Sequence, residues 1–105
     1  MKEISVVELK SKMDANEEFQ LIDVREPYEI DICSIGGESI PMATVLNQTE
    51  KISRDKPVII HCRSGQRSAA VVMQLESAHG YENLYNLTGG ILAYADEVDN
   101  SLSKY

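Results

Sequence analysis

The chain has 105 residues, of which 43% are hydrophobic, so it can form one compact domain over residues 1–105 with a modest core. Seventeen acidic residues against ten basic ones give a net charge of −7, which disfavours nucleic acid and anionic membranes as partners. The apolar runs are much shorter than the ~20 residues that span a bilayer, and "MKEISVVELK" lacks the pattern of a signal peptide. We therefore expect a cytoplasmic protein.

The first half of the chain alternates short strand and helix patterns. Ser5 and Glu8 have the spacing of a capping box, which predicts a helix through about Met13 after a short strand. Pro27 suits the first turn of another helix. The remaining segments are a strand at 19–24, a helix at 27–32, a short edge strand at 38–42 and a weak helical pattern at 43–52.

The second half carries the strongest patterns. The run "PVIIHC", residues 57–62, is typical of a buried parallel strand. A helix is predicted over 67–79, with Gly80 as its C-cap. A strand at 82–87, a turn at 88–90 and a helix at 91–98 follow. This alternation predicts an α/β domain with a mostly parallel sheet of about five strands flanked by helices.

The two cysteines, Cys33 and Cys62, form neither a CxxC pair nor a metal-ligand set. A disulfide framework is not expected in a cytosolic chain. We therefore predict no metal or organic cofactor, and reactivity or packing remains as the reason for each thiol. We expect Cys33 to lie in a turn without a catalytic role, although its sequence position alone leaves a redox role open.

The segment "CRSGQRS", residues 62–68, joins the strongest strand to the strongest helix. Ligands gather at such strand ends in parallel sheets, and the first amides of a helix have no partner within it. Gly65 gives the backbone the freedom to curl these amides into an anion-binding nest. The helix dipole and the charges of Arg63 and Arg67 also favour a thiolate, so the segment predicts an activated nucleophile at Cys62. A cysteine after an apolar strand is commonly a buried small hydrophobe, but the polar flanks here favour reactivity.

Three motifs in order resemble the rhodanese family: "LIDVREPYEI", "CRSGQRS" and "LTGGILAYADEV". The tail "ADEVDNSLSKY" is similar to rhodanese domains fused to enzymes that adenylate ubiquitin-like sulfur carriers. The resemblance covers nearly the whole chain and implies a three-layer rhodanese-like fold. It also implies that Cys62 carries a persulfide, and that Asp23 and Arg25 have a mainly structural role. One departure is Ser34, which stands where family members commonly have a histidine.

The same resemblance assigns a substrate-binding cradle to the residues after the cysteine, with Arg63 attracting anionic donors and Arg67 closing the loop. These residues are Arg63, Ser64, Gly65, Gln66, Arg67 and Ser68. The implied activity moves a sulfane sulfur from thiosulfate or a persulfide donor to a thiol, cyanide or a sulfur-carrier protein.

Two other functions remain open at this stage. A rhodanese-like domain can serve as a docking or sensing module, although such versions usually lack the cysteine that this chain retains. Related phosphatases and arsenate reductases have five residues between cysteine and arginine, whereas Cys62 and Arg67 are separated by four. The smaller ring favours a single sulfur atom over a tetrahedral oxyanion, although Asp23 could serve as an acid.

Overall fold

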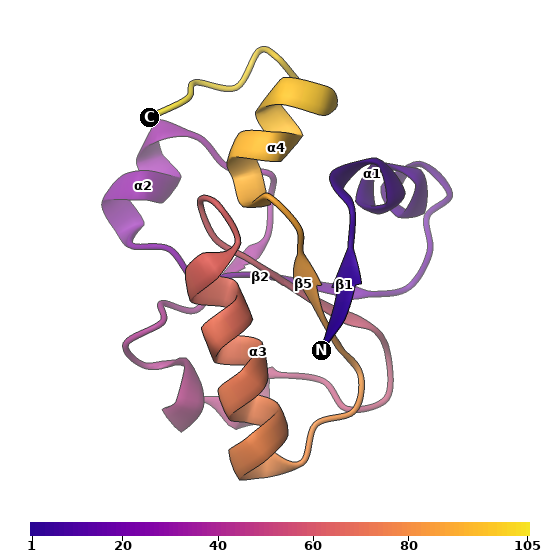
Figure 1. Ribbon diagram of the computed structural model, residues 1–105, viewed down its shortest axis with the longest axis vertical. Helices are drawn as coiled ribbons and strands as arrows, with labels where there is room; N and C mark the ends of the chain where they lie inside the picture. The colour runs from indigo at the N-terminus through magenta and orange to yellow at the C-terminus, as the bar shows by residue number, and fades with distance from the viewer.

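The computed structural model describes residues 1–105 as a five-stranded parallel sheet in the order β1-β5-β4-β2-β3. The strands are β1 (Lys2–Ile4), β2 (Gln20–Asp23), β3 (Glu38–Ser39), β4 (Val58–His61) and β5 (Leu84–Leu87). The helices are α1 (Val6–Asp14), α2 (Pro27–Ile32), α3 (Gln66–His79) and α4 (Gly90–Glu97). Figure 1 shows the helices arranged around the sheet, which confirms the predicted α/β class.

Alternate side chains of the central strand β4 enter two hydrophobic cores. Val58 and Ile60 belong to a core that includes Val71 and Leu75 of α3. Ile59 belongs to a second core with Leu9 of α1 and with Tyr94 of α4. This alternation follows from the period of two in a strand, and it places helices on both faces of the sheet. All four residues of β4 are buried, as expected for a central parallel strand.

The local signals at the helix ends are also confirmed. The Ser5 hydroxyl accepts a hydrogen bond from the Glu8 amide, and the Glu8 carboxylate accepts one from the Ser5 amide. Pro27 is at the start of α2, and Gly80 ends α3 in the left-handed conformation with φ of 66°. These contacts involve residues close in sequence, so the sequence pattern was sufficient to predict them.

The helical pattern at 43–52 forms two 3₁₀ turns, Val45–Asn47 and Thr49–Lys51, rather than one α-helix. The Thr44 hydroxyl bonds to the Pro41 carbonyl, which competes with regular helical bonding. Val45 and Ile52 nevertheless reach the first core. The expectation of a helix at this segment was therefore wrong.

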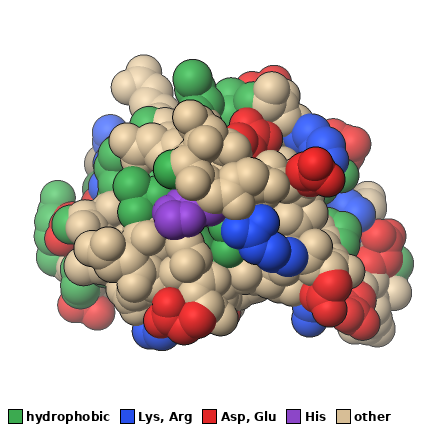
Figure 2. Space-filling model, turned by 90° about the horizontal axis from the view of Figure 1, so that it is seen from below, with side chains coloured by type: hydrophobic (Ala, Val, Ile, Leu, Met, Phe, Trp, Pro, Cys, Tyr) green, Lys and Arg blue, Asp and Glu red, His purple; other side chains and the backbone are tan.

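The surface carries charges of both signs. On the face drawn in Figure 2, basic side chains stand singly among acidic ones and do not form a continuous band. No helix is both long enough and apolar enough to cross a membrane.

Candidate active site

Cys62 lies directly after β4, at the carboxyl end of the central strand, and only 1% of the residue is exposed. Its Sγ atom accepts hydrogen bonds from the Gly65 amide at 3.1 Å and the Ser68 amide at 3.4 Å. The Ser68 hydroxyl lies 3.3 Å from the same sulfur. Two backbone donors and one side-chain donor therefore converge on one sulfur atom at the N-terminus of α3.

These donors decide the protonation of the cysteine. Burial by itself raises the pKa of the Cys62 thiol, because desolvation disfavours the thiolate. Hydrogen bonds from the Ser68 hydroxyl and amide, and from the amides of Gly65 and Ser64, outweigh this effect and lower the pKa below its ordinary value of 9.0. These hydrogen bonds therefore stabilise the thiolate, the nucleophilic form of cysteine, more than in a free cysteine.

The first turn of α4 forms hydrogen bonds with the loop that begins at Cys62. The Ile91 amide donates to the Cys62 carbonyl at 3.0 Å, and the Leu92 amide donates to the Arg63 carbonyl at 3.1 Å. These bonds satisfy helix amides that have no partner within α4, and they direct two loop carbonyls away from the sulfur. Gly90 permits this approach, since a Cβ atom there would clash with the carbonyl oxygen of Arg63.

Asn86 of β5 fixes both residues that donate to the sulfur. Its side-chain amide donates to the Gly65 carbonyl at 3.2 Å, and its Oδ1 atom accepts from the Ser68 hydroxyl at 2.5 Å. Ser68 has one hydroxyl proton, so this proton can be directed to Asn86 or to Cys62 but not fully to both. Asn86 thus sets the position of the nearest side-chain donor to the thiolate.

Arg67 is paired with Glu29 of α2. Two parallel hydrogen bonds of 2.8 Å join its guanidinium to the two carboxylate oxygens, and Glu29 is 2% exposed. The Arg67 bonds hold the pKa of Glu29 at about 2, well below its ordinary value of 4.5. Glu29 chiefly, and Cys62 to a smaller extent, raise the pKa of Arg67, so Arg67 keeps its charge and part of that charge is offset by Glu29. The same ion pair ties the start of α3 to α2.

A second ion pair, which is fully buried, joins Arg25 to Asp23 at the end of β2. Arg25 bonds Asp23 through both Nε and Nη2, with an Nη2–Oδ2 distance of 2.8 Å. His61 Nε2 is 3.5 Å from Asp23 Oδ2, and burial lowers the pKa of His61, so the ring favours its neutral form. Asp23 and Arg25 therefore form the buried polar network expected at this strand end, with Asp23 engaged by Arg25.

The other residues singled out from the sequence lie around this centre. Ser64 and Gln66 are exposed, and Gln66 begins α3. Cys33 is at the end of α2, where its carbonyl accepts a bond of 2.8 Å from Arg25. The Ser34 hydroxyl accepts from the Gly36 amide, so Ser34 stabilises a local turn.

Sequence reasoning missed three side chains of the site: Glu29, Asn86 and Tyr105. Glu29 lies in the first turn of a helix, where an acidic residue is common, and Asn86 lies within a strand pattern. Tyr105 follows α4 in the C-terminal segment, which runs back to α2 (Figure 1). Only the spatial position of these residues reveals their link to the loop.

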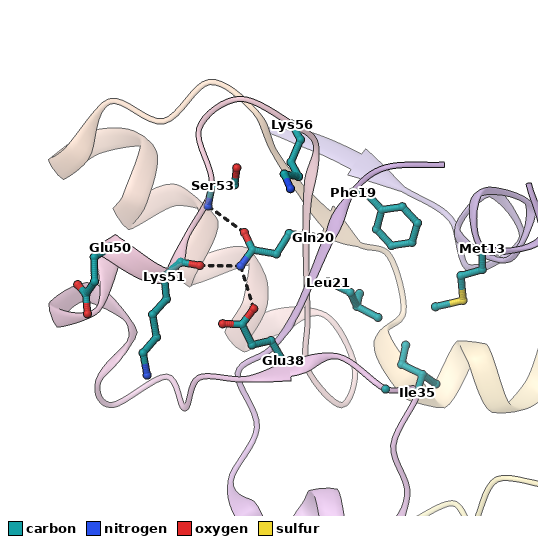
Figure 3. Close-up of a pocket in the computed structure, with 11 residues that line it drawn as sticks. Met13, Phe19, Gln20, Leu21, Ile35, Glu38, Glu50, Lys51, Ser53 and Lys56 are labelled. Carbon is teal, nitrogen blue, oxygen red and sulfur yellow. Dashed lines mark hydrogen bonds between the residues drawn. The ribbon is translucent and has the colours of Figure 1, made fainter. Parts of the chain in front are cut away.

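The largest surface hollow is separate from Cys62. It has a volume of about 720 Å³ and includes no residue of the 62–68 loop. Figure 3 shows Gln20 within it, bonded to Glu38, to the Lys51 carbonyl and to the Ser53 amide. The structure contains no group of three or more side chains suited to hold a metal ion. The candidate reactive centre is the convergence of hydrogen-bond donors on Cys62 Sγ.

The chain is similar in sequence to longer proteins of several organisms. The chain is 41% identical to "Rhodanese-like/PpiC domain-containing protein 12, chloroplastic" of Arabidopsis thaliana, with 100% of this chain and 38% of the plant protein covered. It is 32% identical to "Probable adenylyltransferase/sulfurtransferase MoeZ" of Mycobacterium tuberculosis, with 93% of this chain and 26% of that protein covered. The chain thus spans well under half the length of these two relatives.

Shorter relatives match over most of their length. "Putative sulfurtransferase YtwF" of Bacillus subtilis is 38% identical, with 92% of this chain and 93% of that protein covered. The crystal structure of a rhodanese-like domain protein from Staphylococcus aureus is 31% identical and has a TM-score of 0.82, with 100% of this chain and 99% of that chain covered. The family model of the rhodanese-like domain matches residues 5–97. The chain therefore belongs to the rhodanese-like domain family.

Proposed function

We propose that this protein is a sulfurtransferase that works by double displacement through a persulfide on Cys62. The observation that carries the proposal is the convergence of the Gly65 amide, the Ser68 amide and the Ser68 hydroxyl on Cys62 Sγ. Relatives named as sulfurtransferases support sulfur transfer as the class of reaction. An activated thiolate among anion-binding donors is suited to accept a sulfane sulfur.

In the first step, the Cys62 thiolate attacks the sulfane sulfur of thiosulfate. A sulfur–sulfur bond forms to Cys62, the sulfur–sulfur bond of thiosulfate breaks, and sulfite leaves with the electron pair of that bond. In the second step, an acceptor such as cyanide attacks the outer sulfur, and the Cys62 thiolate leaves. The products are thiocyanate and the starting enzyme, so no external oxidant or reductant is required.

The loop supplies the substrate-binding cradle in this proposal. The outer sulfur carries the negative charge of the persulfide, and inward amides stabilise such an anion without reorganisation. The cradle comprises Arg63, Ser64, Gly65, Gln66, Arg67 and Ser68. With four residues between Cys62 and Arg67, the ring suits a single sulfur better than a phosphate or arsenate group.

We further propose a protein acceptor as an alternative to cyanide. Support comes from the relative whose name joins an adenylyltransferase to a sulfurtransferase, of which this chain matches 26% of the length. A thiol of a sulfur-carrier protein would then attack the outer sulfur, so that a new persulfide forms on the carrier and the Cys62 thiolate leaves. Thiosulfate and a protein persulfide remain the candidate donors.

Mass spectrometry after incubation with thiosulfate tests the proposal. We expect the peptide that contains Cys62 to gain one sulfur atom, and a reductant to remove it. Cys62→Ser should abolish both this gain and thiocyanate formation, because a hydroxyl cannot hold a persulfide. A folded wild-type protein that gains no sulfur from thiosulfate or from a protein persulfide would contradict the proposal and favour a docking role.

Ring size can be tested separately. Insertion of one glycine between Gly65 and Gln66 gives five residues between Cys62 and Arg67. We expect sulfur transfer to fall and arsenate or phosphate binding to rise, with circular dichroism as the check on folding. Undiminished transfer in the folded insertion variant would refute the argument from ring size.

A further inference from the structure

Arg63, the residue directly after Cys62, has a positive side chain that makes no ion pair. Arg25 is paired with Asp23, and Arg67 is paired with Glu29, whereas no salt bridge involves Arg63. The Arg63 Nε atom is buried and has no hydrogen-bond partner. A free cation next to Cys62 would attract an anionic donor, but a long unpaired side chain needs a contact that fixes its direction.

Tyr105 provides this contact. Its ring centroid lies 4.9 Å from the central guanidinium carbon of Arg63, within the range in which an aromatic face attracts a cation. Both side chains are half-buried. The partial desolvation strengthens this attraction relative to the same pair in open water.

The hydroxyl of Tyr105 joins the ring to the Arg25–Asp23 and Arg67–Glu29 ion pairs. It accepts a hydrogen bond of 2.9 Å from Arg25 Nη1 and donates one of 2.9 Å to Glu29 Oε1. Arg25 and Glu29 are 0% and 2% exposed, so the anchor is a rigid, buried network. The C-terminal segment after α4 brings Tyr105 to this network beside α2 (Figure 1).

We propose that Tyr105 is a positioning residue that fixes the direction of the Arg63 guanidinium on the loop that follows Cys62, where it attracts anionic sulfur donors. The thiosulfate part of this inference rests on the proposed function; the contact between Tyr105 and Arg63 does not. Arg63 contributes the charge, and Tyr105 contributes its direction. Loss of the Tyr105 ring should therefore have the same effect as loss of the Arg63 charge.

The test compares two alkylating reagents that differ in charge. Anionic iodoacetate senses a positive charge beside the Cys62 thiolate, whereas neutral iodoacetamide does not, so the ratio of their rate constants isolates the local electrostatic attraction. We measure this ratio at low salt in a Cys33→Ser background, which leaves one reactive thiol. The variants are Tyr105→Leu, Arg63→Ala and the double variant, with melting temperatures recorded for each.

We expect Tyr105→Leu and Arg63→Ala each to lower the ratio by about two- to five-fold, as a cation–π contact and a nearby charge allow. The double variant should match Arg63→Ala, because the ring acts through the arginine. Tyr105→Phe keeps the ring and should retain a larger ratio than Tyr105→Leu. The inference would be overturned if Tyr105→Leu had the same rate ratio as the background protein. It would also be overturned if the fold-losses of the two single variants multiplied in the double variant, or if Tyr105→Phe lowered the ratio as much as Tyr105→Leu.

Tyr85→Leu is the matched control, because Tyr85 holds the Lys2 cation at 5.4 Å on the β1–β5 edge of the sheet. This variant loses a similar contact away from the loop and should keep the ratio of the background protein. In the active enzyme, Tyr105→Leu should raise the KM for thiosulfate by a similar factor with kcat less changed, the pattern of lost substrate attraction. If the protein transfers no sulfur, the proposed function fails, while the alkylation ratio still tests the role of Tyr105.

Discussion

Acidification should remove a defined part of the stability of this fold through Glu29. This carboxylate is buried. It accepts two hydrogen bonds from Arg67, one from the Tyr105 hydroxyl and one from the Glu26 amide. Arg67 holds the pKa of Glu29 at about 2 in the folded protein, against an ordinary value of 4.5. A carboxylate whose pKa is depressed on folding stabilises the native state above its unfolded pKa and loses this effect as the pH falls.

The size of the effect follows from the two pKa values. A depression from 4.5 to about 2 corresponds to about 3 kcal/mol at neutral pH. Linkage predicts that about 2 kcal/mol of this is lost between pH 7 and pH 3, and nearly all of it by pH 2. These are upper figures, because the Arg67 side chain is 35% exposed and solvent screens its charge.

Urea denaturation of the wild type and of Glu29→Gln at pH 7, 5 and 3 measures this contribution. Glutamine keeps the size of the side chain but does not titrate, so the difference in unfolding free energy between the two proteins should shrink by about 2 kcal/mol from pH 7 to pH 3. Glu97→Gln is the control, since Glu97 is exposed at the end of α4, and it should follow the wild-type curve.

A difference between wild type and Glu29→Gln that stays constant from pH 7 to pH 3 would refute the reasoning. It would mean that Arg67 does not stabilise the Glu29 carboxylate in the folded state.

The same variant should also make the loop less ordered, because Glu29 connects Arg67 and Tyr105. Amide hydrogen exchange at residues 63–68 should therefore be faster in Glu29→Gln at pH 7.

Four further variants test the loop, two left-handed glycines and the second cysteine. Ser68→Ala removes a donor to the Cys62 thiolate, so the pH profile of iodoacetamide alkylation should move to higher pH, with a rate about tenfold lower on the acidic side; an unchanged profile would contradict the assigned cause of the lowered pKa. Gly90→Ala would place a Cβ atom 2.7 Å from the Cys62 carbonyl oxygen, and we expect it to cost about 2–4 kcal/mol of unfolding free energy in urea denaturation. Gly80→Ala has the same left-handed strain but open space around the new atom, so it should cost only about 1 kcal/mol, and equal losses at the two glycines would exclude a steric role for Gly90. Cys33→Ser should retain most sulfur transfer in a thiocyanate assay, and inactivation equal to that of Cys62→Ser would refute a single-cysteine mechanism.

Much of the fold follows from patterns that are local in the sequence. The apolar run of β4, the capping box at Ser5 and the glycine that ends α3 each act within a few residues, so each was predicted correctly. The segment 43–52 was not predicted correctly. Its short polar side chains form hydrogen bonds with nearby residues, and 3₁₀ turns are enough to bring its two core residues into the hydrophobic core. The strand order also depends on crossovers that no local pattern specifies.

For the site, the sequence pattern predicted the proposed nucleophile and the loop that surrounds it. A cysteine at the end of a buried strand, followed by a glycine and by the free amides of a helix, is enough to place Cys62 at an anion-binding turn. The tertiary structure alone decided which charges remain free there. Glu29 lies 38 residues from Arg67 in sequence, and Tyr105 lies 76 residues from Glu29. Because ion pairs and cation–π contacts depend on distance in space, only the folded chain shows that Arg67 is paired with Glu29 and that Arg63 faces Tyr105.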